Sequence, residues 1–146
     1  MATIRGGDKL ALALSQIAKS LSKHETLRVG FLEGATAPNG DSMPLRAAMN
    51  EFGTRKIPAR PFFRNMVAAK SGEWPEGIAT ALRAHDYDTT KALELTGQAI
   101  KGQLQQSIKD TNSPPLAPST IKRKGCDKPL VQTGDMMNAV DFEIKS

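Results

Sequence analysis

The strongest constraint on the fold is an apolar stripe at helical spacing, formed by Leu93, Gly97, Ile100, Leu104 and Ile108. This stripe predicts one long helix, with Thr89 or Thr90 as its N-cap. Gly97 and Gly102 would weaken the helix unless another backbone approaches it closely there. Composition favours helix as well, because the 146 residues include 18 alanines and 13 leucines but four valines.

Further helices are predicted from local start and stop signals. Asp8 can cap a first helix, Ser42 and Pro61 can each open another, and Gly53 would end the helix that follows Ser42. A weaker helix begins at Trp74, and one or two turns are expected at 134–139. The apolar faces expected on the first three helices are Leu10, Leu14, Ile17 and Leu21; Leu45, Ala48, Met49 and Phe52; and Phe62, Phe63, Met66 and Val67.

Two segments, 27–31 and 140–144, alternate apolar and polar residues and are predicted to pair as strands. Segment 33–41 contains two glycines and an Asn-Gly pair, so a mobile loop is expected there, and the proline-rich segment 111–118 is expected to be a second loop. The prediction is therefore an α+β fold: one mostly helical domain over 1–146, with a small antiparallel sheet.

Length and cysteine content exclude several classes of protein. A chain of 146 residues can bury a sufficient core without covalent or metal cross-links. Cys126 is the single cysteine, so neither a disulfide framework nor a cysteine-based zinc site is available. No apolar run is long enough to span a bilayer, and no signal-peptide pattern opens the chain. We expect a soluble protein made in a reducing cytoplasm, without a membrane partner.

The net charge of +5 lies entirely in the first half, where residues 1–65 carry ten Lys and Arg against five Asp and Glu. Two local clusters stand out, and each is either a solvated surface or a site for phosphate or an acidic protein face. Their basic residues are Arg55, Lys56, Arg60 and Arg64 in the first, and Lys122, Arg123, Lys124 and Lys128 in the second.

Catalysis is disfavoured because the reactive side chains are scattered. The two histidines, His24 and His85, are remote in sequence from each other and from Cys126. Ser119 and Lys122 have Ser-x-x-Lys spacing, but the companion motifs of that enzyme class are absent, so Ser119 is interpreted as a helix cap. No phosphate-cradling glycine motif or metal-ligand spacing occurs. We therefore expect that the chain is not an enzyme and binds no cofactor; a small hydrolase is the least favoured hypothesis.

A basic DNA-binding protein is the main alternative. The first basic cluster adjoins Phe62 and Phe63, which could offer a stacking surface to bases. Adjacent residues at a helix start point about 100° apart, however, so at least one ring belongs in the core. No recognised DNA-binding motif accompanies them.

Two blocks of sequence carry a resemblance to a known family: 50–64 (NEFGTRKIPARPFFR) and 115–137, with PLAPSTI, KG and PLVQTGDMM in order. The chain resembles the neck or tail-completion proteins of long-tailed bacteriophages, also labelled virion morphogenesis or minor tail proteins. The resemblance spans roughly residues 8–145. The chain departs from the family pattern at Gln132 and at Pro114-Pro115.

The resemblance implies a small α+β protein without catalytic activity that forms a ring at the head–tail junction of the virion. Its implied partners are further copies of itself, as a hexamer or dodecamer, and the neighbouring connector or head-closure and tail-terminator or tail-tube proteins. Packaged DNA would pass nearby without sequence-specific contact. The layer of the neck and the ring order stay open, and assembly would take place in the bacterial cytoplasm.

Proline-framed segments suit such contacts because they lose little entropy on binding. We predict that Phe62 or Phe63 points inward while the basic side chains point toward an acidic partner. The residues expected at the interface are Arg55, Lys56, Arg60, Phe62, Phe63, Arg64, Lys122, Arg123, Thr133 and Gly134.

Overall fold

The computed structural model describes residues 6–111 and 134–146. The predicted α+β class is confirmed, with helices dominating and a small antiparallel sheet. The elements in chain order are α1 (Gly7–Leu21), β1 (Thr26–Phe31), α2 (Met43–Phe52), α3 (Phe62–Lys70), the 3-10 turn η1 (Ser71–Glu73), α4 (Trp74–Ala84), α5 (Thr89–Asp110), α7 (Asp135–Ala139) and β2 (Val140–Lys145).

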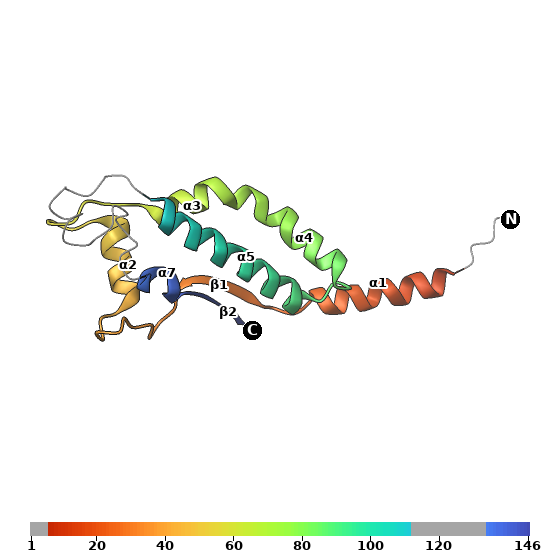
Figure 1. Ribbon diagram of the computed structural model, residues 1–146. Coiled ribbons are helices and arrows are strands. Elements are labelled where there is room, and N and C mark those ends of the chain that lie inside the picture. The colour runs from red at the N-terminus through yellow and green to blue at the C-terminus, as the bar shows by residue number, and fades with distance from the viewer. Residues whose placement is uncertain (1–5, 112–133) are drawn as a thin grey trace.

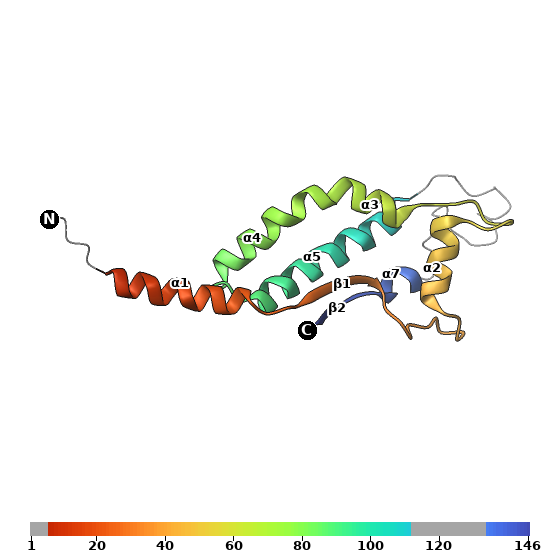
Figure 2. The same ribbon diagram turned by 180° about the vertical axis from the view of Figure 1, so that it is seen from behind.

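The long helix α5 runs through the middle of the molecule, with α3 and α4 along one side and the sheet along the other (Figure 1). Helices α2 and α7 lie at one end of this body, and α1 extends from the opposite end (Figure 2). A central helix covered on two sides explains why α5 has more buried residues than any other described helix or strand. Its buried residues are Ala92, Thr96, Gly97, Ile100, Leu104 and Ile108.

Strands β1 and β2 pair antiparallel in the register that places Leu27 opposite Ile144 and Val29 opposite Phe142. Gly97 of α5 lies directly over this sheet. A Cβ at Gly97 would stand 2.5 Å from Cδ2 of Phe142, so only glycine lets the helix approach this closely. The close approach predicted for Gly97 therefore exists, but a side chain rather than a backbone makes it. Gly102 faces open space.

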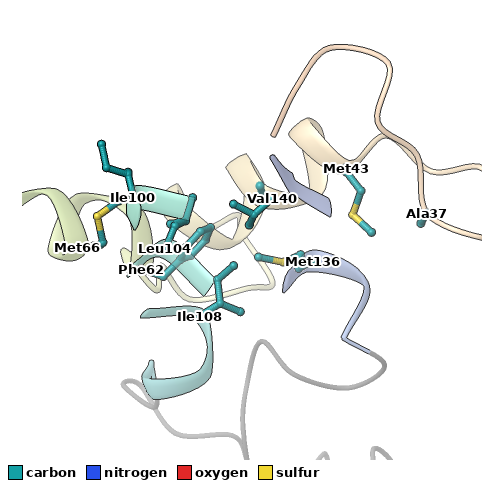
Figure 3. Packing of buried hydrophobic residues seen from close by; sticks show 10 residues of the cluster. Ala37, Met43, Phe62, Met66, Ile100, Leu104, Ile108, Met136 and Val140 are labelled. Atoms are coloured by element: carbon teal, nitrogen blue, oxygen red, sulfur yellow. The ribbon is translucent and has the colours of Figure 1, made fainter. Parts of the chain in front are cut away.

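The core joins α3, α5, α7 and β2. Figure 3 shows Phe62, Leu104, Ile108, Met136 and Val140 gathered together, with Met66 and Ile100 on one side and Met43 and Ala37 on the other. Phe62, Leu104, Ile108 and Val140 are almost completely buried. Phe62 also meets Phe31 edge to face, with 6.1 Å between ring centroids.

Some caps differ from those predicted. Helix α1 begins after Gly6, which makes no side-chain cap, and Asp8 lies in the first turn instead. The N-cap of α5 is Asp88, whose carboxylate accepts from the Lys91 amide at 3.1 Å. The hydroxyl of Thr90 is used elsewhere, donating to the Glu25 carboxylate at 2.7 Å. Ser42 caps α2 as predicted, accepting from the Leu45 amide.

Loop 33–41 has no helix, as expected, but it is held by its own hydrogen bonds. The Ala37 amide donates to the Asp41 carbonyl at 2.8 Å, and Thr36 pairs with Ser42. Ala37 is buried against the core. The mobility expected for this loop stays a prediction. Of the proline-rich segment 111–118, only Thr111, which follows the end of α5, falls within the described residues.

Candidate protein-interaction surface

The 50–64 block folds onto itself through one carboxylate. Glu51 is buried near the end of α2, and its side chain reaches the first turn of α3. Its oxygens accept from the Phe63 amide at 2.9 Å and from the Arg64 amide at 3.1 Å. Pro61 precedes α3 and has no side chain that can cap it. Glu51 therefore caps a helix that begins eleven residues later, and its negative charge suits that N-terminus.

Arg64 completes this arrangement. Its Nε lies 2.8 Å from Oε1 of Glu51, and its Nη2 donates to the Glu51 carbonyl at 3.2 Å. The guanidinium also lies over the ring of Phe52, 5.1 Å from the ring centroid. Arg64 is thus partly exposed but engaged with α2, rather than free to meet a partner.

The turn between α2 and α3 depends on Gly53, which has a φ of +77°. A Cβ at Gly53 would stand 2.8 Å from the Ala59 amide nitrogen, so the returning chain leaves no room for a side chain. The Thr54 amide donates to the Ile57 carbonyl at 2.7 Å, and the Arg60 amide donates to the Asn50 carbonyl at 2.7 Å. The segment is a stiff strap that joins two helices.

The prediction that all four basic residues of the first cluster point outward is wrong for Arg60. Arg60 is 5% exposed, and burial lowers the pKa of its guanidinium. Arg55 and Lys56 are exposed at the tip of the strap, as predicted. The main chain accounts for the burial of Arg60, because its amide donates to the Asn50 carbonyl of α2.

The two phenylalanines divide as expected. Phe62 fills the core, whereas Phe63 is half-buried beside strand β1. A Cβ at Gly30 would stand 3.3 Å from the Phe63 ring, so the glycine lets that ring lie against the strand.

The remaining predicted interface residues lie in or beside the second sequence block. Gly134, with a φ of +78°, is the N-cap of α7. Lys122, Arg123 and Thr133 lie outside the described residues.

The apolar face predicted for α2 is the wrong one. The helix buries Met43, Ala47 and Glu51 at positions i, i+4 and i+8, while Leu45 is 60% and Phe52 is 68% exposed. A periodicity argument that counts only apolar residues places Glu51 outside, because its burial depends on the amides of α3. Leu45 and Phe52 therefore lie at the surface.

A groove of about 400 Å³ lies beside this exposed face, between α2, β1 and the start of α3. Its polar side chains are Glu51 and Arg64, which bond to each other, so its walls are otherwise apolar. The groove is lined by Val29, Gly30, Phe31, Pro44, Ala47, Ala48, Glu51, Phe52, Phe62, Phe63 and Arg64.

A second apolar surface lies on α1, which buries none of its residues. Leu10 is 61%, Leu14 is 56% and Leu21 is 46% exposed, and these leucines share one face of the helix. The helix is tied to the body near its C-terminal end, where the Thr89 hydroxyl lies within 3.4 Å of the Ser20 carbonyl. The predicted stripe therefore exists, but nothing in the described part of the chain covers it.

Within 6–111 and 134–146, no group of three or more His, Cys, Asp and Glu side chains could hold a metal ion. No helix in those ranges is long and apolar enough to cross a membrane. The two apolar surfaces, rather than a cluster of titratable groups, form the candidate site.

Comparison with known proteins adds no relative: no family model, no curated protein and no solved structure matches the chain.

Proposed function

We propose that this chain is a structural protein of a tailed-bacteriophage virion, a ring-forming neck subunit that completes the tail or connector so that head and tail can join. The observation that carries the proposal is the pair of exposed apolar surfaces on α1 and beside α2. These two helices lie at opposite ends of the described part of the molecule (Figure 1). A subunit with two different contact faces makes heterologous contacts, which form a ring when the rotation from one subunit to the next closes. The order of the two sequence blocks supports the same function by resemblance.

The proposed partners are further copies of the chain and the neighbouring neck proteins, namely a connector or head-closure protein and a tail-terminator or tail-tube protein. Arg55 and Lys56 at the exposed strap tip would meet an acidic face of one neighbour. In this function the chain has no catalytic step and no cofactor. Its location would be the head–tail junction, with DNA passing nearby.

The positions of Arg60, Phe62 and Arg64 weaken the alternative that the chain is a basic DNA-binding protein. Arg60 is buried, Arg64 is bonded to Glu51, and Phe62 is in the core, so the basic stretch does not present its residues as one surface. Binding to duplex DNA across a salt series separates the two functions. Affinity through phosphates would fall steeply with salt, whereas an apolar contact between proteins would persist.

In vitro complementation of head–tail joining tests the proposed function. A lysate of the encoding phage or prophage lacking this chain should contain DNA-filled heads and separate tails. Adding the purified chain should restore infectious particles, while an unrelated basic protein of similar size should not. Complete, infectious particles in the lysate lacking the chain would exclude the proposed function.

A further inference from the structure

The helix α1 has the surface of a partner-binding element rather than a core helix. Isolated helices of up to about 15 residues are marginal in water, and α1 has 15 residues, no side-chain N-cap and no buried residue. Its apolar stripe, formed by Leu10, Leu14, Ile17 and Leu21, carries no charge, since Asp8, Lys9 and Lys19 lie off that face. Such a helix gains most of its stability by laying this face on another surface.

The groove beside α2 is suited to receive an uncharged helix face. Its one buried carboxylate, Glu51, is already satisfied by two amides and by Arg64, so covering the groove would leave no unpaired charge. Phe52 and Leu45 extend the apolar surface beyond the groove along α2. A groove with these properties matches the mode in which an amphipathic helix packs its apolar face into a hydrophobic channel.

The two surfaces cannot meet within one molecule. Helix α1 extends beyond one end of the α5 body, and α2 lies at the other end, in both views of the chain (Figures 1 and 2). We infer that α1 of one copy docks in the α2 groove of the next copy, head to tail. The inference deepens the proposed function, since it names the contact that would join subunits of the ring.

The structure supplies matched variants for each surface. Leu14 lies on the stripe and Leu12 lies on the opposite face of α1, and both are exposed, so L14Q should break the contact while L12Q should not. Ala48 lines the groove and Ala68 is an exposed alanine on α3 outside it, so A48E and A68E form the second pair. Helical circular dichroism of each variant reports whether it is folded.

The experiment is sedimentation of the full chain over a concentration series. Wild type, L12Q and A68E should self-associate, whereas L14Q and A48E should each associate at least ~10-fold more weakly, about the effect expected for losing one central apolar contact. Mixing L14Q with A48E should then form a 1:1 pair, because one copy retains an intact groove and the other an intact helix. A homodimer contact between like surfaces would give no such rescue.

Three results would overturn the inference: a wild-type chain that is monomeric at about 1 mM, self-association unaffected by both L14Q and A48E, or no rescue on mixing. Binding of the monomer to anionic vesicles, lost in L14Q, would assign the stripe to a lipid surface instead. The joining assay separates this inference from the proposed function. If the wild-type chain restores joining but L14Q and A48E self-associate normally, the helix contact alone is wrong. If self-association follows the prediction but the chain does not restore joining, the neck function alone is wrong.

Discussion

Glu51 and Arg64 are joined across the turn between α2 and α3, with 2.8 Å between Oε1 of the carboxylate and Nε of the guanidinium. The same carboxylate accepts from the Phe63 and Arg64 amides, so it serves the start of α3 as much as it serves the ion pair. The segment from Glu51 to Arg64 therefore has an intramolecular role. Its residues Glu51, Phe52, Phe63 and Arg64 form one wall of the groove.

The first prediction concerns this carboxylate. Glu51→Ala should lower the free energy of unfolding by about 2–3 kcal/mol, because two helix amides and the Arg64 guanidinium lose their acceptor. Arg64→Ala should have a smaller effect, about 1 kcal/mol or less, because that side chain is 60% exposed. Urea denaturation measures both. Glu76→Ala, which breaks an exposed pair with Arg83, is the control and should change the value by less than about 0.5 kcal/mol.

The second prediction uses the two glycines of α5. Gly97→Ala should destabilise the fold by about 1–3 kcal/mol, because its Cβ would stand 2.5 Å from Phe142. Gly102→Ala should stabilise it by about 0.5–1 kcal/mol, since that position is open and alanine favours helix. Thermal unfolding of the two variants should shift in opposite directions. A shift of the same sign in both would contradict the packing of α5 on the sheet.

The third prediction compares Gly53, which combines a positive φ with a close backbone contact, with Gly40, which has a positive φ alone. Gly53→Ala should lower the unfolding free energy by more than about 2 kcal/mol, because a positive φ is combined with a backbone contact at 2.8 Å. Gly40→Ala also has a positive φ but open surroundings, and should cost about 1 kcal/mol. Equal effects in chemical denaturation would mean that the strap does not pass this close to Gly53.

The fourth prediction concerns the exposed basic tip. Reversing Arg55 and Lys56 together to glutamate should leave the unfolding free energy within about 0.5 kcal/mol of wild type, because both side chains are exposed. Head–tail joining should nevertheless fall, because an acidic neighbour would meet acidic residues. The corresponding reversal of Arg60 with Arg64 does not test the interface, since Arg60 is buried and Arg64 holds Glu51. Normal joining by the tip variant would remove Arg55 and Lys56 from the interface.

Helices and strands could be predicted from the sequence because their signals are local. The stripe from Leu93 to Ile108 predicts α5, alternation predicts β1 and β2, and Ser42 with Gly53 marks the two ends of α2. The periodicity of apolar residues and the conformational preferences of glycine and proline act within a few residues of the chain.

The features that were mispredicted depend on contacts between distant residues. The buried face of α2 includes Glu51 because its carboxylate accepts from the first amides of α3, which has no cap of its own. Without these amides the carboxylate would stay in water. Arg60 is buried because the strap returns against α2, which no local pattern records. The groove itself is the space left between three elements, so it could not be identified before their packing was known. The one signal in the sequence is the position of Glu51, an acid four residues after Ala47 and eight after Met43, on one face of the helix.

The most direct test that the chain is a neck subunit is immunogold electron microscopy of particles from the encoding phage or prophage, with antibody raised against this chain. A strain lacking the chain is the control. A neck subunit should give gold label at the junction of head and tail, and the deletion strain should give separate heads and tails. Unlabelled junctions together with intact particles in the deletion strain would contradict the neck function.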